Sequence, residues 1–329
     1  MIGNRKKVLV VGRLHHDGLR LLEGRGDVEF EVLDDGSEEN ILRHMAGVAG
    51  IAVRIARITR RIVEASDALQ IVSRHGVGYD SVDVGACTDR GVRLTVAPRA
   101  NAPSVAEQAM MFLLALAKQV QAFDPLVRAG DWTRRNEVKT FDLEGRTLLI
   151  VGLGRIGSRL VRRARAFDMR VLGYDPYVAP DAIRAMDAEP VADFRAVLRE
   201  VDALSVHCPR NPETIGMIGA AELSALRPGA VVVNCARGGI IDEAALVAAV
   251  SSGHLAGAGV DVFDVEPPAA DHPFFTEPRI LLTPHAAGMS LEAARRSAVQ
   301  TVENILAAFD GALDPAVVVN KEVLARASL

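Results

Sequence analysis

The chain has 329 residues, of which 49% are hydrophobic and 24% charged, and its formal net charge at pH 7 is −4. The length predicts two domains and at most three, and the net charge gives no support for nucleic-acid binding driven by overall charge. No apolar run is long enough to cross a membrane, and the one near the N-terminus is too short for a secretory signal. We therefore expect neither nucleic acid nor a membrane as a partner.

Three cysteines, Cys87, Cys208 and Cys235, are scattered along the chain. Their number is odd, and no spacing between them is typical of a zinc site or of a disulfide framework. We therefore predict no bound metal and a reducing, cytoplasmic location.

The first hundred residues alternate short apolar strands with helical patterns. Strands are predicted at Lys7–Gly12, Val28–Leu33, Ala49–Val53, Leu69–Ser73 and Val92–Val96, and helices at His16–Glu23, Ser37–His44 and Ser81–Arg90. This alternation is typical of a doubly wound parallel sheet. The segment contains no glycine motif for a dinucleotide, so it predicts an α/β domain that does not itself bind one.

A long and mostly apolar helix is predicted over Asn101–Gln121. Ser104, with Glu107 three residues further on, fits a capping box at its start. The helix is apolar nearly all round between residues 105 and 117, so it must be buried on most sides. It is expected to cross between domains or to lie in a subunit interface.

The polar stretch Asp124–Thr140 follows this helix. Gly130 and Asp131 favour a turn within it, and it carries the only tryptophan of the chain, Trp132. We predict that the stretch leaves the core as an arm of the kind that reaches a second subunit, which favours a homodimer.

The stretch Thr147–Pro176 predicts a strand, a glycine turn, a helix and a second strand. Gly152, Gly154 and Gly157 have G-x-G-x-x-G spacing between the first strand and the helix. The first glycine allows a tight turn, the second lets a pyrophosphate approach the backbone, and the third lets the helix pack close to the strand. The helix N-terminus supplies free N–H groups for the phosphates, so the stretch predicts a dinucleotide site.

An acidic residue, Asp175, ends the second strand of this unit. A carboxylate in this position accepts hydrogen bonds from the adenosine ribose and repels a 2′-phosphate, so it favours NAD over NADP. Arg155 and Ile156 lie inside the glycine loop, and the motif places Arg155 near the pyrophosphate.

The remaining chain continues the alternation of strands and helices. Strands are predicted at Ala203–Cys208, Val231–Asn234, Gly257–Val262 and Ile280–Thr283, and helices at Asp193–Glu200, Ala220–Ala225, Glu243–Ser251 and Ser290–Phe309. We predict two doubly wound parallel-sheet domains. A Rossmann domain at residues 101–285 binds NAD, and it is inserted into a substrate domain formed by residues 1–100 and 286–329.

Polar side chains follow three of the later strands. Arg237 lies in VVVNCARGGIIDE, Asp261 and Glu266 lie in GAGVDVFDVEP, and His285 lies in ILLTPHAAG. In a doubly wound sheet, ligands bind beyond the carboxyl ends of the strands. We therefore expect these side chains to converge near the nicotinamide.

Over nearly its whole length the chain resembles the NAD-dependent D-isomer-specific 2-hydroxyacid dehydrogenases. The segments that carry the resemblance are, in that family's order, SRHGVGYDSVD, NAPSVAEQ, VGLGRIG, NCARGGIIDE, DVFDVEP and TPHAAG. The resemblance implies a flavodoxin-like substrate domain beside the Rossmann domain. It also implies the interconversion of a small D-2-hydroxy acid and its 2-oxo acid, with Arg237, Glu266 and His285 as the catalytic residues.

The chemistry of these three residue types suits that reaction. The Arg237 guanidinium can make forked hydrogen bonds to the oxygens of a 2-oxo acid and polarise its carbonyl group. His285 can give a proton to the carbonyl oxygen as hydride arrives, and take it back in the oxidation, because imidazole titrates near neutrality. Glu266 would hold the imidazole and favour its protonated form.

The resemblance assigns further binding residues. The backbone N–H groups of Gly76, Val77 and Gly78 would hold the substrate carboxylate. Asp261 would contact the nicotinamide carboxamide, and Cys208 and Pro209 would line the adenine side. Further cofactor contacts are implied at Cys235, Ala236 and Gly288, and a further substrate contact at Asn101.

The identity of the acid is less sharply indicated. Arg54 and Arg74 resemble arginines that phosphoglycerate dehydrogenases use for a second anionic group, and Arg134 resembles an arm arginine offered to a neighbouring subunit. Ile55, however, stands where those enzymes commonly have serine. The leading hypothesis is an enzyme like the short phosphoglycerate dehydrogenases that lack a regulatory domain.

Two alternatives remain at this point. The first is a hydroxypyruvate or glyoxylate reductase, which shares the same catalytic set. The second belongs to another class, an NAD-sensing binding protein like the family's transcriptional corepressors, which use the same fold to bind partners. The complete set of Arg237, Glu266 and His285 favours an enzyme.

Overall fold

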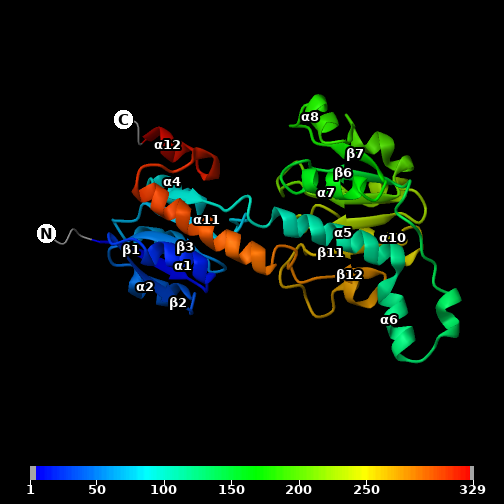
Figure 1. Ribbon diagram of the computed structural model, residues 1–329, viewed down its shortest axis with the longest axis horizontal. Coiled ribbons are helices and arrows are strands. Elements are labelled where there is room, and N and C mark those ends of the chain that lie inside the picture. Colours follow the sequence, from blue (N-terminus) through cyan, green and yellow to red (C-terminus); the bar gives the residue numbers. More distant parts are fainter. Residues whose placement is uncertain (1–4, 327–329) are drawn as a thin grey trace. The chain divides into compact units, whose positions relative to one another are not determined.

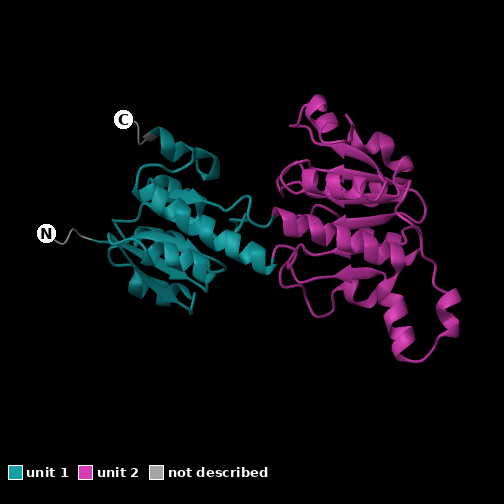
Figure 2. Cartoon of the chain, in the orientation of Figure 1, with its two compact units in different colours: residues 1–101, 289–329 teal, residues 102–288 magenta. Residues whose placement is uncertain are grey.

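A computed structural model describes residues 5–326 of the chain (Figure 1). The chain divides into two compact units (Figure 2). Unit 1 comprises Met1–Asn101 and Met289–Leu329, and unit 2 comprises Ala102–Gly288. Each unit is built on one parallel sheet with helices packed against it.

The sheet of unit 1 has five strands in the order β2-β1-β3-β4-β5. Their bounds are β1 Lys6–Val11, β2 Val28–Leu33, β3 Val48–Val53, β4 Ile71–Arg74 and β5 Arg93–Thr95. All pairs are parallel, and the order is that of flavodoxin-like folds. The predicted fold class of this part of the chain is therefore confirmed. Every residue of the central strand β3 is buried, as expected for a strand that is covered on both faces.

The helices of unit 1 come from both ends of the chain. They are α1 His16–Glu23, α2 Glu38–His44, α3 Arg60–Glu64, α4 Val84–Asp89, α11 Leu291–Phe309 and α12 Glu322–Arg326, with a 3₁₀ turn at Pro315–Val317. Helix α11 packs on α1, β3 and β4. A Cβ added at Gly18 of α1 would lie 2.8 Å from the carbonyl of Ala298, so a glycine allows this close approach of the two helices.

The sheet of unit 2 has seven parallel strands in the order β12-β11-β10-β9-β6-β7-β8. Their bounds are β6 Thr147–Val151, β7 Arg170–Tyr174, β8 Glu189–Pro190, β9 Ala203–Val206, β10 Val231–Asn234, β11 Gly257–Val260 and β12 Ile280–Leu282. Counted from β6, this is the Rossmann order with a seventh strand added at one edge. The strand order reverses between the neighbouring strands β6 and β9. A Rossmann sheet binds its ligand at the carboxyl ends of the strands at such a point.

Helices cover both faces of this second sheet. They are α5 Ala102–Lys118, α6 Val120–Arg128, α7 Gly157–Arg165, α8 Pro180–Ala185, α9 Ala220–Ala225 and α10 Glu243–Ser251, with 3₁₀ turns at Thr133–Asn136, Phe194–Glu200 and Pro273–Thr276. The apolar helix α5 packs on β10, β11 and α7. Its Phe112 fills the space over Gly259 of β11, where a Cβ would lie 2.4 Å from the ring.

The first part of α5 differs from its prediction. The helix begins at Ala102, so Ser104 lies inside it and the predicted capping box is wrong. Pro103 is favoured in the first turn, because the N–H that it lacks has no partner in a helix at that position. The carboxylate of Glu107 instead accepts a hydrogen bond from Arg163 of α7 at 2.7 Å.

The predicted single helix over Asn101–Gln121 is also broken. It ends at Lys118, and Gln119 adopts a left-handed φ of 53° before α6 begins. The Gln119 side chain donates to the carbonyl of Leu116 at 2.7 Å, which satisfies a carbonyl left open by the break. Within residues 5–326 no single helix could cross a membrane, and only α5 and α6 taken together, across a 60° bend, have the necessary length and composition.

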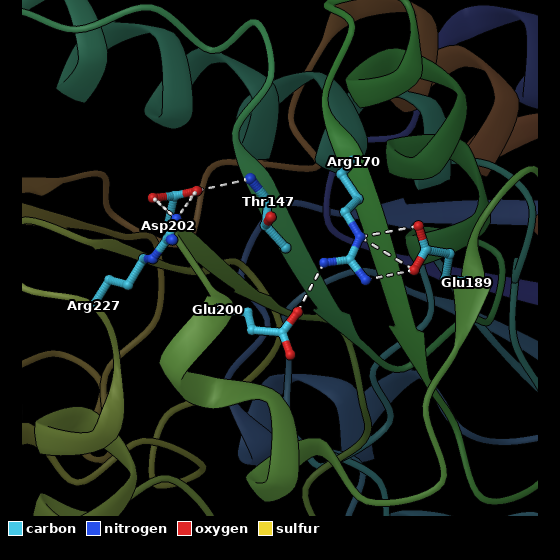
Figure 3. A network of polar contacts seen from close by, with 6 residues as sticks. All are labelled: Thr147, Arg170, Glu189, Glu200, Asp202 and Arg227. Atoms are coloured by element: carbon cyan, nitrogen blue, oxygen red, sulfur yellow. Dashed lines mark hydrogen bonds and ion pairs between the residues drawn. The ribbon is translucent and has the colours of Figure 1, made fainter.

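Two groups of hydrogen bonds and ion pairs lie at the amino ends of neighbouring strands of unit 2 (Figure 3). The Asp202 carboxylate, next to β9 and only 9% exposed, accepts a hydrogen bond from the Thr147 N–H at 2.9 Å and one from Arg227 at 3.1 Å. Arg170, at the start of β7, bonds the carboxylates of Glu189 and Glu200 at 2.7 and 2.8 Å. These contacts stabilise the sheet at the amino ends of its strands, opposite the carboxyl ends.

Replacing Asp202 by alanine is expected to lower the free energy of unfolding by about 2–4 kcal/mol. The change leaves a buried N–H without its acceptor and removes the anion that two arginines, Arg146 and Arg227, contact. Urea unfolding followed by circular dichroism measures the effect. The control is Glu200→Ala, which breaks an exposed ion pair and should cost less than about 1 kcal/mol. Equal losses for the two variants would contradict this account of Asp202.

Candidate active site

The glycine loop of unit 2 lies between β6 and α7. Gly152 has a φ of +94°, which glycine alone adopts at low cost, and a Cβ there would lie 2.7 Å from the backbone of Cys208. Gly157 opens α7, where a Cβ would lie 2.0 Å from the Gly152 carbonyl oxygen. A Cβ at Gly154 would meet no atom within 4 Å beyond its own neighbours. This open side allows a pyrophosphate to approach, so the loop fits a dinucleotide.

The two predicted residues inside this loop differ in exposure. Arg155 is exposed, and its carbonyl accepts a hydrogen bond from Arg159 of α7 at 2.7 Å. Ile156 is half-buried and packs against the apolar core below α7. Arg155 is thus accessible to solvent, whereas the side chain of Ile156 contributes mainly to packing.

Asp175 follows the end of β7, as predicted, and its carboxylate is already oriented. One oxygen accepts from the Leu153 N–H at 2.9 Å and the other from the Tyr177 N–H at 3.0 Å. Each carboxylate oxygen can accept further hydrogen bonds, so Asp175 keeps the capacity to bind a ribose.

Cys208 and Pro209 follow β9, which is the neighbour of β6 in the sheet. Burial, together with the charge of Asp175, raises the pKa of the Cys208 thiol to about 11.

The three predicted catalytic residues follow three adjacent strands. Arg237 comes after β10, Glu266 after β11 and His285 after β12, and these strands are neighbours in the sheet. The Nδ1 atom of His285 lies 2.7 Å from Oε2 of Glu266. Because a carboxylate only accepts, Nδ1 carries the proton, and Nε2 is left for a substrate. The second oxygen, Oε1 of Glu266, accepts from the Phe263 N–H at 3.0 Å.

The backbone at His285 is held in an uncommon conformation. Its φ is 52°, in the left-handed region that few residues other than glycine adopt. The His285 N–H donates to the Asp261 carbonyl at 2.7 Å, and the Asp261 carboxylate accepts from the N–H groups of Ala286 and Ala287 and from the Thr283 hydroxyl. Strain of this kind persists where the surroundings fix it, and it gathers at functional sites.

Asp261 is nearly inaccessible, with 1% of its surface exposed. Burial raises its pKa, whereas the hydrogen bonds from Thr283 and from the two backbone N–H groups act in the opposite direction. The structure therefore gives Asp261 a role that the sequence did not indicate, which is to hold the turn that carries His285. Gly288, the other predicted cofactor residue of this turn, ends unit 2.

The loop after β10 is organised by Asn234. Its side chain accepts from the Ala236 N–H at 3.0 Å and donates to the Arg237 carbonyl at 2.9 Å. The Arg237 guanidinium donates to the Ala236 carbonyl at 2.7 Å. Cys235 is buried beside this loop, and burial and the charge of Asp261 raise the pKa of its thiol well above the usual value. Its thiol is therefore neutral near pH 7 and serves packing.

The predicted substrate residues of unit 1 gather at the carboxyl ends of β3 and β4. Arg54 follows β3, and Arg74 ends β4 opposite Val53 in the register. His75 follows Arg74 directly, and its Nε2 is 3.3 Å from the carbonyl of Ala294 in α11. Burial lowers the pKa of His75 to about 4, and the charges of Arg54 and Arg74 add to this effect. Near neutral pH His75 is therefore neutral and adds no positive charge to that of Arg54 and Arg74.

The glycine stretch after β4 is half-buried. Gly76 has a φ of +127°, and its carbonyl accepts from the Ala97 N–H at 2.7 Å. Val77 and Gly78 follow it directly.

Asn101, at the end of the first part of unit 1, has a buried Oδ1 with no hydrogen-bond partner among the described residues. An unpartnered buried acceptor of this kind points to a ligand or a water molecule.

Arg134 lies in the 3₁₀ turn after α6. Its Nε donates to Glu137 at 2.9 Å, and a second ion pair at 3.7 Å joins it to Asp131. Trp132 next to it is 63% exposed, and no residue of α6 is buried. The stretch thus leaves the core of unit 2, as its polar composition indicated.

Three residues near the site were not singled out from the sequence. Asn234 and Thr283 lie at strand ends, where short polar residues commonly fix turns, so their positions offered a weak signal. His207, after β9, is the third. Its Nε2 lies 2.8 Å from the Ser205 hydroxyl, whereas its buried Nδ1 has no partner among the described residues. Burial lowers the pKa of His207 to about 4.

Comparison with known proteins agrees with the dinucleotide-binding fold of unit 2. Residues 110–287 match the family model described as "D-isomer specific 2-hydroxyacid dehydrogenase, NAD binding domain". Over 308 residues the chain is 36% identical to a D-3-phosphoglycerate dehydrogenase of Methanocaldococcus jannaschii. The alignment covers 93% of this chain and 58% of that protein. The chain therefore spans less than two thirds of the length of this relative.

Two other proteins match over nearly their whole length. A glyoxylate reductase of Thermococcus litoralis is 32% identical over 329 residues, covering 97% of this chain and 98% of that protein. The crystal structure of a glyoxylate reductase from Paecilomyes thermophila superposes with a TM-score of 0.85 at 28% identity, covering 97% of this chain and 99% of that one. The family match extends over more than half of the chain, and residues 110–287 form its NAD-binding domain. The chain therefore belongs to the D-isomer specific 2-hydroxyacid dehydrogenases.

Proposed function

We propose that the protein is an oxidoreductase that interconverts a small D-2-hydroxy acid and its 2-oxo acid with NAD. The observation that carries the proposal is the 2.7 Å contact between Nδ1 of His285 and Oε2 of Glu266. These two residues follow β12 and β11, and β11 is the neighbour of β10, which Arg237 follows. A hydride transfer to a carbonyl group needs a proton donor, and an imidazole oriented by a carboxylate supplies one. The NAD-binding domain in which all three residues lie supports the same reaction.

In this mechanism each residue has a separate task. The nicotinamide, when bound, supplies or accepts the hydride. His285 donates the Nε2 proton to the carbonyl oxygen in the reduction and removes it from the hydroxyl group in the oxidation. Glu266 fixes the tautomer and the orientation of the imidazole. Arg237 binds the carboxylate and carbonyl oxygens with forked hydrogen bonds and stabilises the negative charge that develops in the transition state.

We propose that the glycine loop and Asp175 hold the cofactor, and that Asp175 sets a preference for NAD. Asp175→Ala is expected to raise the kcat/KM ratio of NADPH to NADH by roughly 10–100-fold. It removes hydrogen bonds to the ribose, each worth about 1.5 kcal/mol, and the repulsion of a 2′-phosphate. Steady-state rates with both cofactors measure the ratio.

Asp181→Ala is the matched control for that variant. It removes a carboxylate of the same unit whose side chain is 97% exposed, and it should leave the cofactor ratio unchanged. A native enzyme with equal or higher kcat/KM for NADPH would refute the role of Asp175.

We propose that residues 1–101 and 289–329 act as the substrate domain. The backbone N–H groups of Gly76, Val77 and Gly78 would hold the substrate carboxylate, and the buried Oδ1 of Asn101 would accept a hydrogen bond from the substrate or a bound water. Arg54 and Arg74 would receive a second anionic group, which supports a phosphoglycerate dehydrogenase-like enzyme. A hydroxypyruvate or glyoxylate reductase is the alternative, and the similarity to the Thermococcus glyoxylate reductase supports it.

A panel of acids distinguishes these activities. The kcat/KM values for 3-phosphoglycerate, glycerate, lactate and sulfolactate are compared in the oxidation, and those for hydroxypyruvate and glyoxylate in the reduction. A clear preference for 3-phosphoglycerate supports the second anion site, and a preference for glyoxylate supports the alternative. Binding of NADH without turnover of any acid would instead favour an NAD-sensing binding protein.

We further propose a cytoplasmic homodimer. All three cysteines are free thiols, which supports a reducing compartment. The amphipathic helix α6 buries none of its residues, and its Val120 and Val127, together with Trp132 of the predicted arm, are 55–63% exposed. An arm with so much exposed apolar surface supports contact with a second copy. Sedimentation equilibrium measures the assembly directly.

A further inference from the structure

The loop Asp261–Pro267 carries Glu266, so the position of the Glu266 carboxylate depends on how this loop is fixed. Part of the fixation is internal, since Oε1 of Glu266 accepts from the Phe263 N–H at 3.0 Å. The next backbone N–H of the loop, that of Asp264, donates outward to Oε1 of Glu243 at 2.8 Å. Glu243 therefore bonds the peptide next to the one that holds Glu266.

A second side chain orients the Glu243 carboxylate. Nε2 of His272 lies 3.1 Å from Oε2 of Glu243. Nδ1 of the same imidazole accepts from the Phe274 N–H at 3.3 Å, so Nε2 carries the hydrogen and donates it to Glu243. Both side chains are largely covered, at 13% exposure for His272 and 25% for Glu243. The His272 ring also packs against Phe263 and Phe274, with ring centres 5.5 and 4.7 Å apart.

The same loop is pressed against the glycines that follow Arg237. A Cβ at Gly238 would lie 1.9 Å from the Phe263 carbonyl oxygen, and a Cβ at Gly239 would lie 2.7 Å from the Asp264 carboxylate. The loops of Arg237 and Glu266 thus touch along their backbones. Glu243 comes shortly after these glycines in the chain and reaches across to the second loop, so it ties the two loops together.

The Glu243 carboxylate is not needed to start helix α10. The N-cap of that helix is Asp242, whose side chain accepts from the Ala245 N–H at 2.8 Å. Two adjacent carboxylates therefore have different partners. Asp242 satisfies the helix to which it belongs, and Glu243 turns to the loop that carries Glu266.

We propose that Glu243, oriented by His272, is a positioning residue for the Glu266–His285 pair. This inference rests on the proposed function, in which that pair transfers the proton. Glu243 touches neither substrate nor cofactor. It holds the Asp264 peptide so that Glu266 stays within hydrogen-bond distance of His285. Small displacements of such groups reduce turnover strongly while binding is retained, because the reacting groups must be aligned in the transition state.

The test compares Glu243→Ala, Glu243→Gln and Asp242→Ala in the full chain. Glu243→Ala is expected to lower kcat by roughly 10–100-fold, with the KM values of NADH and the 2-oxo acid within about threefold of native. Glu243→Gln should recover part of kcat, since its amide oxygen still accepts from Asp264, while its NH2 group cannot accept from His272. Asp242→Ala is the matched control, which weakens the same helix and should lower Tm with kcat unchanged.

A second readout does not depend on turnover. The ring nitrogen signals of His285, assigned by their loss in His285→Gln, report which nitrogen carries the proton in a long-range ¹H–¹⁵N spectrum. We expect the native protein and Asp242→Ala to show a proton on Nδ1, and Glu243→Ala to shift toward the Nε2 form.

Signals of His285 that are the same in Glu243→Ala as in the native protein would overturn the positioning role, whatever the rates are. Equal losses of kcat in Asp242→Ala and Glu243→Ala would also overturn it, because they would indicate a general effect on α10. If the native protein turns over no acid while the signals respond to Glu243→Ala, the proposed function fails and the positioning of His285 by Glu243 holds.

Discussion

His285→Gln is expected to lower kcat for the reduction of a 2-oxo acid by roughly 10²–10⁴-fold, the usual size of a general acid–base contribution. Glutamine retains a polar side chain that can still contact Glu266, but it has no group that can donate a proton and recover it near neutral pH. Binding of NADH should persist, because the glycine loop and Asp175 lie at the ends of other strands. Stopped-flow reduction rates and NADH fluorescence measure the two properties separately.

His254→Gln is the control for that experiment. His254 belongs to the same unit, and its Nε2 lies 3.2 Å from the carbonyl of Leu223, away from the three strand ends of the candidate site. Its replacement should leave kcat within about twofold of native. Turnover close to native in His285→Gln would remove the assignment of His285 as the proton donor.

Replacement of Arg237 is expected to have an effect of similar size on kcat/KM. In the proposed mechanism Arg237→Ala would remove two charge-assisted hydrogen bonds to the substrate, each worth about 1.5–3 kcal/mol, and should lower kcat/KM by roughly 10³-fold. Arg237→Lys keeps the charge but not the planar fork, so it should recover only part of the loss. Initial rates over a range of acid concentrations separate kcat from KM.

The control for Arg237 is Arg195→Ala. Arg195 forms a surface ion pair with Glu222 at 2.8 Å in the same unit, and its loss should change kcat/KM by less than twofold. A full recovery of activity in Arg237→Lys would show that charge alone is needed and would contradict forked binding.

Most of the fold could be predicted because its signals are local. Buried parallel strands appear as short apolar runs, and the glycine loop has a spacing set by the backbone of Gly152 and Gly157. The parallel pairing in both sheets then follows from the alternation of strand and helix. The strand orders were not predicted, because the same alternation gives a different order in each sheet. The positions of Arg237, Glu266 and His285 beyond the ends of three strands were also accessible from the sequence. Their catalytic roles came from the family resemblance and stay predictions.

The errors have a common physical origin. The break at Gln119 has no glycine or proline to mark it, and it depends on how α5 packs in the core. Ser104 and Glu107 fit a capping box by spacing, but a proline in the first turn lets the helix begin earlier. Local patterns were compatible with more than one arrangement, and tertiary contacts selected between them.

The supporting contacts were the least predictable part of the site. Glu243 and His272 are 29 residues apart in the chain, and nothing in their local sequences links them. Asp261 was assigned to the cofactor by resemblance, whereas its contact with the turn of His285 is visible only in three dimensions. Residues that act on other residues leave no motif, because their partners come from distant segments.

The separation between the amino and carboxyl ends of the strands in unit 2 has a consequence for engineering. Asp202 and its arginines join the amino ends of the strands, and the candidate site lies beyond the carboxyl ends, about 16 Å away along a five-residue strand such as β6. Substitutions that far apart, with no shared partner, have additive energies. Contacts at the amino ends can therefore be redesigned for heat tolerance independently of the substrate range. A gain in the free energy of unfolding there can offset the destabilising changes that a new specificity requires at the carboxyl ends.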